Sequence, residues 1–298
     1  MSFESLAVQR WALPNGIELH GVRAGKGVPL IFIHGAMGDW RSWEAQWSAF
    51  TAHFDCISYS RRFSFPNQNH QSSPHHSALD EALDLEHLLN LLSIDKAILV
   101  GSSYGGFTAL ALAVQAPQRI QALVAVEPPM MKYAYFTPEG RDIAEAFRTS
   151  TIEPANAAFR AGDDVRAAQI MTGGINGATS TVSSGAAMDK RLQNLQAMKM
   201  IALSSDEFPL ISPEQLAALP MPVLLMSGLN TQPVHKAIFD NVVVAMPNAK
   251  AVRVAGAGHG VSREQAAFFN NTVLAFWQNA RRFELAAQGC ANAGFLGS

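Results

Sequence analysis

The sequence predicts an α/β protein in which a mostly parallel central sheet is flanked by helices and carries a helical insertion. Three observations predict this fold. Short apolar runs alternate with segments of helical period along most of the chain. The run at 28–33 is apolar throughout, as in a strand that is buried on both faces. Residues 130–218 interrupt the alternation between two strands of the same expected sheet.

The first expected elements form a hairpin. Residues 8–13 and 17–23 have the pattern of strands, and Asn15-Gly16 between them is typical of a tight turn. The further strands expected are 28–33, 54–60, 97–100, 122–126, 223–226 and 251–255. The helices expected between them are 40–52, 77–92, 104–116, 234–245 and 262–282.

Two of these helices have a recognisable apolar face. The aromatic residues at helical spacing in the first are Trp40, Trp43, Trp47 and Phe50. The leucines that form the expected stripe of the second are Leu79, Leu83, Leu88 and Leu92.

The interruption gives the expected domain organisation. Residues 1–129 and 219–282 form one α/β core, residues 130–218 form a cap, or lid, over it, and residues 283–298 form a C-terminal tail without periodicity. The insertion is rich in methionine and aromatic residues, which either line an adaptable apolar surface or form the insertion's own core.

Composition limits the partners. Charged residues make up 15% of the 298 residues and the net charge is −2, so we expect no nucleic-acid surface. The N-terminus lacks the features of a signal peptide, and no apolar run approaches the ~20 residues that span a bilayer. The distant Cys56 and Cys290 favour two free thiols. We expect a cytoplasmic monomer or homodimer that acts on a small molecule, without nucleic-acid or membrane partners.

The stretch VGSSYGG, at the end of the expected strand 97–100, contains a G-x-S-x-G motif. The tight strand-to-helix turn of this motif leaves no room for side chains two positions before and after the nucleophile. Ser103 is flanked by Gly101 and Gly105, whereas Ser102 is flanked by Val100 and Tyr104. Ser103 is therefore the candidate nucleophile.

A serine nucleophile requires hydrogen-bond donors for the developing oxyanion. The backbone N–H of Tyr104, at a helix N-terminus, is one candidate. The other is the N–H of Ala36, just past the His34-Gly35 turn at the end of the strand 28–33. We interpret His34 as a structural residue of that turn and not as a catalytic base.

These motifs resemble the α/β-hydrolase superfamily over roughly residues 28–282. The segment HGAMGDWRSWEAQ, which includes Trp40, Ser42, Trp43 and Gln46, is similar to the His-Gly segment of the epoxide-hydrolase and dehalogenase branch. That branch has an aspartate nucleophile, whereas this chain has Ser103. The difference favours acyl transfer from an ester-like carbonyl over epoxide or carbon–halogen hydrolysis.

The resemblance implies the chain order nucleophile, acid, histidine. His259 follows an apolar run and a glycine-rich loop, and it precedes the last helix, so it is the candidate base. His70, His75 and His76 lie in a polar stretch without cysteine or acidic ligands at a recognisable spacing. We interpret that stretch as a solvated loop and expect no metal and no cofactor.

The acid is not at its usual place. The family usually carries it after the strand that ends here at Ser227-Gly228, but that loop contains Asn230 and no Asp or Glu. Glu127 ends the preceding strand, and some haloalkane dehalogenases of the superfamily carry their acid there. Glu127 is the preferred candidate, and Asn230 remains the alternative.

The expected activity is cofactor-free hydrolysis of a small to medium apolar ester, thioester or lactone by a serine esterase. The triad would be Ser103, His259 and Glu127. Carbon–carbon bond hydrolysis, acyl transfer to an alcohol, or ligand binding with little turnover remain alternatives. The candidates for substrate contact are Trp40, Arg61 at the end of strand 54–60, and Met130 in the insertion.

Overall fold

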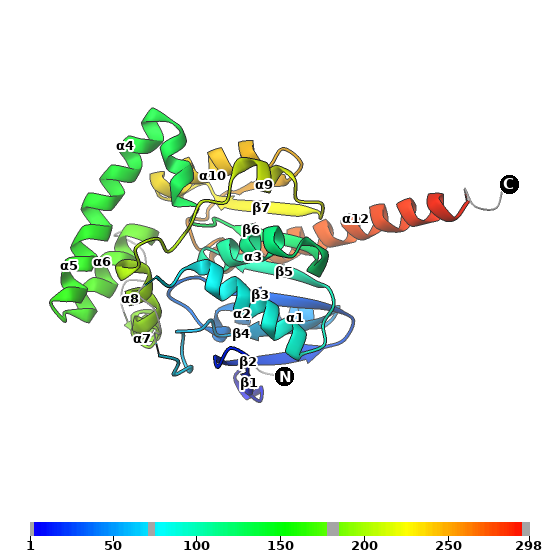
Figure 1. Ribbon diagram of the computed structural model, residues 1–298, viewed down its shortest axis with the longest axis horizontal. Coiled ribbons are helices and arrows are strands. Elements are labelled where there is room, and N and C mark those ends of the chain that lie inside the picture. Colours follow the sequence, from blue (N-terminus) through cyan, green and yellow to red (C-terminus); the bar gives the residue numbers. More distant parts are fainter. Residues whose placement is uncertain (1–2, 71–74, 178–184, 294–298) are drawn as a thin grey trace.

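The computed structural model describes residues 3–70, 75–177 and 185–293, without the side chains of residues 4 and 282–293. In this part of the chain one twisted sheet of eight strands forms the centre, in the order β1-β2-β4-β3-β5-β6-β7-β8 (Figure 1). Its strands are β1 (Gln9–Ala12), β2 (Glu18–Gly25), β3 (Val28–Ile33), β4 (Phe54–Tyr59), β5 (Ala97–Ser102), β6 (Ile120–Val126), β7 (Val223–Gly228) and β8 (Lys250–Val254).

Strand β2 is antiparallel to both of its neighbours, and the strands from β4 to β8 are parallel. The predicted hairpin and all six later strands are confirmed, with small differences in their ends. Strand β6 lies between β5 and β7, so the carboxyl ends of these three strands meet at one edge of the sheet.

Helices cover both faces of the sheet because side chains alternate along each strand. On β3, Ile31 and Ile33 belong to one hydrophobic core, whereas Leu30 and Phe32 belong to the other. The first core packs against α2 (Ala78–Leu91), α3 (Tyr104–Gln115), α9 (Pro213–Ala217) and α10 (Pro233–Ala245). The second packs against η2 (Trp40–Trp43), α1 (Glu44–Thr51), α11 (Val261–Glu264) and α12 (Ala266–Ala293).

Two helix predictions need correction. In α2, Leu83 is 43% exposed, and the helix instead buries Leu85 and Leu89 together with Leu88. In the tail, α12 continues to Ala293, beyond the end expected at residue 282, and runs away from the sheet (Figure 1). Within the described residues no helix is both long and apolar enough to cross a membrane. Cys56 is buried with a free thiol, and the side chain of Cys290 lies outside the description.

The segment between β6 and β7 is helical. Its helices α4 to α8 gather beyond one end of the sheet, on the side opposite to the end of α12 (Figure 1). Before α9, it consists of η4 (Met131–Phe136), α4 (Pro138–Phe147), a π-helical turn (Arg148–Ile152), α5 (Glu153–Arg160), α6 (Asp164–Asn176), α7 (Gly185–Leu192) and α8 (Leu195–Leu203).

Several methionines of this segment are buried in packed clusters. Met188 and Met198 lie in a small hydrophobic cluster with Phe159 of α5. Met200 lies in another with Phe63 of the core, and Met171 is buried as well. These side chains are therefore not a free apolar surface.

The junction of β5 and α3 is tightly packed. A Cβ at Gly101 would lie 2.2 Å from the carbonyl oxygen of Gly105, and a Cβ at Gly105 would lie 2.1 Å from the carbonyl oxygen of Ile33. Because these neighbours are backbone atoms, they cannot move aside as a side chain does. Only glycine fits at both positions.

We predict that Gly105→Ala destabilises the fold by roughly 1–3 kcal/mol, as expected for overpacking of a core. Gly173→Ala is the matched control, because nothing lies within 4 Å of its added Cβ and the residue is helical. That control should be neutral or slightly stabilising, since alanine favours helix over glycine. Urea unfolding of both variants checks the prediction. Equal stability of the two would contradict it.

Candidate active site

Ser103 lies on the sharp turn between β5 and α3. Its backbone is in the left-handed region, with φ 52° and ψ −120°, and its N–H donates to the carbonyl of Val126 at 2.7 Å. Its side chain makes no capping hydrogen bond to α3. A strained backbone at a sharp turn between two glycines is the geometry of a nucleophile elbow.

Glu127, directly after β6, lies next to His259. Its Oε2 accepts a hydrogen bond from Nδ1 of His259 at 2.6 Å, and the carboxylate is buried. Because an ionised carboxylate only accepts, the proton is on Nδ1, and Nε2 is free to accept one. Like Ser103, Glu127 has a positive φ, 41°.

The end of β7 and the loop after it also bind this carboxylate. Oε1 of Glu127 accepts from the hydroxyl of Ser227 at 2.8 Å and from the N–H of Gly228 at 2.9 Å, and Oε2 accepts from the hydroxyl of Thr231 at 2.8 Å. Burial alone would raise the pKa of Glu127, but the hydrogen bonds and the nearby histidines lower it to about 2. The carboxylate is therefore ionised at neutral pH.

Asn230 has no comparable position. It is exposed, and its backbone N–H donates to the carbonyl of Ala257 at 2.8 Å. Of the two candidates from the sequence, only Glu127 has a hydrogen bond to His259 among the described residues.

His235, at the start of α10, is a neighbour of His259 that the sequence analysis missed. The two rings are stacked, with centroids 4.2 Å apart and planes inclined by 24°. Nε2 of His235 lies 3.2 Å from the carbonyl oxygen of Ile175. Burial, and then the nearby His259, lower the pKa of His235 to about 3, so its ring is neutral. Nothing in the local sequence distinguishes this histidine, because the contact is formed only by the fold.

His34 holds the turn after β3, which agrees with its interpretation as a structural residue. Its Nε2 accepts from the N–H of Arg61 at 2.9 Å, so the proton is on Nδ1, which donates to the carbonyl of Gly35 at 2.7 Å. Burial, and then the charge of Arg61, lower the pKa of His34 to about 3. A Cβ at Gly35 would lie 3.3 Å from Cβ of Ser103, so this turn passes close to the serine.

The two residues expected to form the oxyanion hole lie on either side of the serine. Ala36 lines the same cavity as Ser103. Tyr104 is the first residue of α3, where N–H groups have no partner within the helix. The Tyr104 side chain points away from the solvent, and its hydroxyl donates to Glu207 of the inserted segment.

The three residues proposed for substrate contact lie elsewhere. Arg61 is 1% exposed, donates to Glu81 at 2.7 Å and stacks over the ring of Tyr104 at 3.6 Å. Trp40 and Met130 are buried in the two cores. None of the three lines the cavity at Ser103. The sequence analysis did not foresee the burial of Arg61, because this burial depends on α2. That helix carries Glu81, the carboxylate partner of Arg61.

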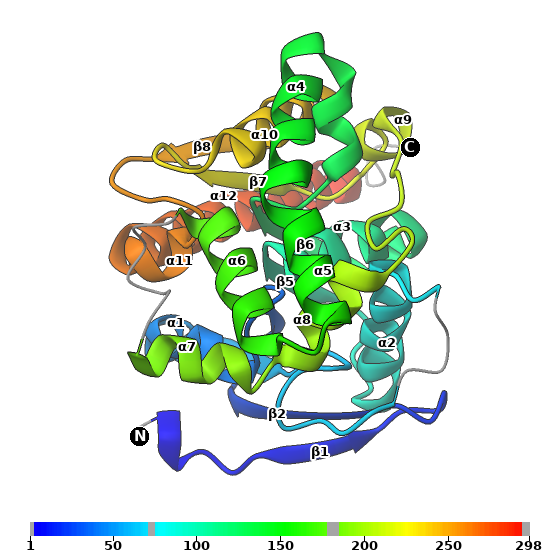
Figure 2. The ribbon, with the colours of Figure 1, turned by 90° about the vertical axis from the view of Figure 1, so that its left-hand side faces the viewer.

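The cavity itself has a volume of about 590 Å³. Ser103, His259 and the turn after β3 form one side of it. The rest is formed by residues from η2 and α1, the end of α6, α7 and α11 (Figure 2). The lining thus contains core residues, from 34–45, 102–103 and 259–263, together with residues of the insertion from 175–194.

Among the described residues, two groups of buried side chains have possible ligand atoms within 4.8 Å of one another. Their members are Glu127, His235 and His259, and His76, Glu81 and Glu207. In the second group Glu81 is paired with Arg61, and Glu207 accepts from Tyr104. His76 is buried and its Nε2 lies 3.3 Å from Glu81, so the interpretation of this histidine as part of a solvated loop was wrong. Oε2 of Glu207 is buried without a hydrogen-bond partner among the described residues.

The chain is similar to known proteins in its sequence and in its fold. An sn-1-specific diacylglycerol lipase of Xenopus laevis is 24% identical over 261 residues, which cover 85% of this chain and 81% of the lipase. The carboxylesterase CesB of Bacillus subtilis has the same fold, with a TM-score of 0.70 at 19% identity over 92% of each chain. An epoxide hydrolase from metagenomes of hot environments has a TM-score of 0.72 at 22% identity, over 92% of this chain and 99% of its own. Residues 30–272 match the model of the alpha/beta hydrolase family. The chain belongs to this family.

Proposed function

We propose that the protein is a serine hydrolase that cleaves a small to medium carboxylic ester, thioester or lactone through an acyl-enzyme. Ser103, His259 and Glu127 are its triad. The observation that carries the proposal is the buried hydrogen bond of 2.6 Å between His259 and the ionised Glu127. Two of the similar proteins are named as a lipase and a carboxylesterase, which supports an ester as the substrate.

In the first half of the reaction, Oγ of Ser103 attacks the carbonyl carbon of the ester, and its proton moves to Nε2 of His259. The ionised Glu127 stabilises the resulting imidazolium and keeps the proton of Nδ1 in place. The N–H groups of Ala36 and Tyr104 stabilise the negative oxygen of the tetrahedral intermediate. The C–O bond then breaks, and the alcohol leaves with the proton from His259.

In the second half, a water molecule attacks the acyl carbon and gives one proton to His259. The bond to Ser103 breaks, the acid is released, and Oγ of Ser103 takes the proton back from His259. An acyltransferase would use an alcohol in place of this water, and a carbon–carbon hydrolase would release a carbanion in place of the alkoxide. These alternatives need the same triad and differ in the substrate.

Ser103→Ala should abolish esterase activity, because the acyl-enzyme cannot form. Loss of a triad serine typically lowers kcat by several orders of magnitude. The measurements are the hydrolysis of p-nitrophenyl esters and labelling by a fluorophosphonate probe, which requires an activated serine. Ser102→Ala is the matched control, since Ser102 lies next to Ser103. Activity in Ser103→Ala together with its loss in Ser102→Ala would refute the assignment. A chain that binds ligands without turnover would not react with the probe.

Glu127→Gln should lower kcat by roughly 10³–10⁴-fold, because the amide keeps the size but not the charge that stabilises the imidazolium. Asn230→Ala should have a small effect, since Asn230 is exposed. Steady-state kinetics on one p-nitrophenyl ester compares the two variants. The opposite ranking would make Asn230 the residue that orients His259.

The pKa of Glu127 also predicts a pH dependence of stability. Its pKa is about 2 in the folded protein against an ordinary value of 4.5. A lowered carboxyl pKa stabilises the fold above the ordinary value, and this contribution is lost as the pH falls toward the folded value. Between pH 4.5 and 2 the free energy of unfolding should therefore fall less steeply in Glu127→Gln than in the wild type. Urea unfolding at several pH values checks this, and equal slopes would contradict it.

A further inference from the structure

The cavity at Ser103 has more basic than acidic side chains in its wall. The basic residues that line it are Arg41, Lys190, Arg191 and Arg263. The acidic ones are Asp39 and Glu44. The whole chain, in contrast, has a net charge of −2. Positive charge is thus concentrated where the substrate of the proposed function would bind.

Two of these arginines have partners of their own. Arg41 binds the carboxylate of Asp39 through two hydrogen bonds, of 2.8 and 2.6 Å. Asp39 also accepts from Asn194 at 3.1 Å, which ties the end of α7 to the turn after β3. Arg263 lies 3.1 Å from Glu264 on α11. These pairs account for their charges without a ligand.

Arg191, at the end of α7, has no such partner. Among the described residues no carboxylate forms an ion pair with it, and its Nε is buried without a hydrogen-bond partner. Within the described part of the chain its hydrogen bond joins Nη1 to the carbonyl of Ala187 at 3.1 Å. Burial, and then the charge of Arg263, lower the pKa of Arg191 to about 10. A partly buried guanidinium without a carboxylate partner is electrostatically unfavourable until an anion binds.

We propose that Arg191 binds an anionic group of the substrate, a carboxylate or a phosphate, within the cavity that holds Ser103. This inference rests on the proposed function and narrows its substrate class to esters that carry a negative charge away from the scissile carbonyl. The planar guanidinium binds carboxylate or phosphate oxygens through two parallel hydrogen bonds. An apolar ester would leave the charge of Arg191 uncompensated.

A purely structural role is the alternative. The bond from Arg191 to Ala187 satisfies a carbonyl near the end of α7, as basic residues often do at a helix C-terminus. In that role Arg191 affects stability but not the choice between charged and neutral esters. The experiment therefore measures the ratio of the kcat/KM values of two substrates with the same enzyme. This ratio does not depend on the amount of folded protein.

The experiment compares kcat/KM for two matched pairs of esters. Mono-p-nitrophenyl adipate and p-nitrophenyl methyl adipate differ by a charge on the acyl side. Para-acetoxybenzoate and its methyl ester differ by a charge on the alcohol side. The ratio of charged to neutral ester is compared between enzyme variants, so that differences in intrinsic reactivity cancel. The pair of esters whose ratio changes in the Arg191 variants shows whether the anionic group lies on the acyl side or on the alcohol side of the scissile bond.

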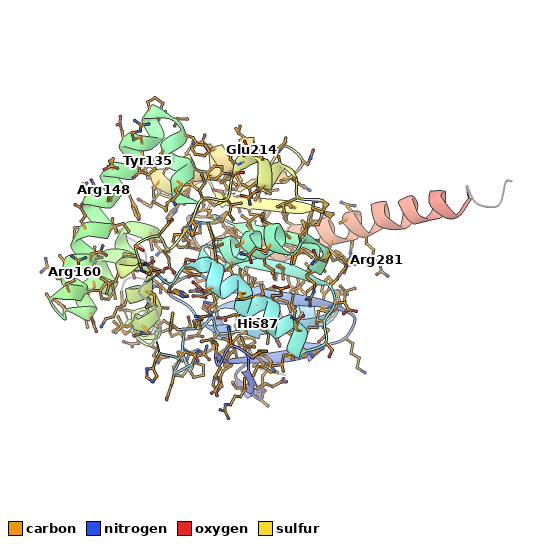
Figure 3. The ribbon with its side chains drawn as sticks, viewed as in Figure 1. His87, Tyr135, Arg148, Arg160, Glu214 and Arg281 are labelled. Carbon is orange, nitrogen blue, oxygen red and sulfur yellow. The ribbon has the colours of Figure 1, made fainter. Side chains whose placement is uncertain are left out.

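In Arg191→Gln, at least one ratio should fall by roughly tenfold or more, since the charge-assisted hydrogen bonds to the anion are lost. Arg191→Lys should give an intermediate ratio, because it keeps the charge but not the two parallel hydrogen bonds. Arg160→Gln is the matched control: Arg160 ends α5, is exposed and does not line the cavity (Figure 3). Both ratios should stay at their wild-type values in this control.

Unchanged ratios in Arg191→Gln would overturn the inference while leaving the proposed function intact. Absence of turnover and of fluorophosphonate labelling in the wild type would instead refute the proposed function. In that case, the role of Arg191 is tested by calorimetric titration with mono-p-nitrophenyl adipate. The titration compares the Ser103→Ala protein with the same protein carrying Arg191→Gln as well. Binding that Arg191→Gln weakens supports the anion site, and equal binding overturns it.

Discussion

The hydrogen bond between Glu127 and His259 depends on the order of three neighbouring strands. Ser103 follows β5, and Glu127 follows β6. Of the four hydrogen bonds to the carboxylate among the described residues, two come from the end of β7, one from the loop after it and one from His259. Because β6 lies between the other two, the carboxyl end of each strand faces the same small volume. A buried carboxylate without these donors would bind a proton and lose its charge. His259, together with the donors at the end of β7, therefore keeps the carboxylate of Glu127 ionised.

The sequence alone predicted the sheet, and it allowed the candidate residues Ser103, His259 and Glu127 to be proposed, because its signals there are local. The G-x-S-x-G motif, the glycine-rich loop before His259 and the missing acid after Gly228 can each be recognised within a few residues. Leu83 and Arg61 could not be assigned in this way. The burial of each depends on how α2 packs, and Glu81, the partner of Arg61, lies on that helix. The stacking of His235 on His259 likewise joins two elements that are separate in the sequence.

The inserted helices are connected to the core at the site itself as well as at their two ends. Tyr104 donates to Glu207, Asn194 binds Asp39 and also accepts from the N–H of Phe65, and Ala78 donates to the carbonyl of Glu207. These contacts join the insertion to the start of α3, to the turn after β3, to the stretch between β4 and α2, and to the start of α2. The basic residues of the cavity wall come both from the core and from the insertion. The net charge of −2, which is a sum over the whole chain, does not reveal this local excess of basic residues.

The position of Glu127 also has a consequence for the charge that the end of β7 can carry. Gly228, at the end of that strand, and Thr231, in the loop after it, donate to the carboxylate that comes from the end of β6. A second carboxylate in this loop would lie close to Glu127, and repulsion between like charges would raise the pKa of one of the two. The uncharged residues 229–232 therefore leave Glu127 without a competing negative charge.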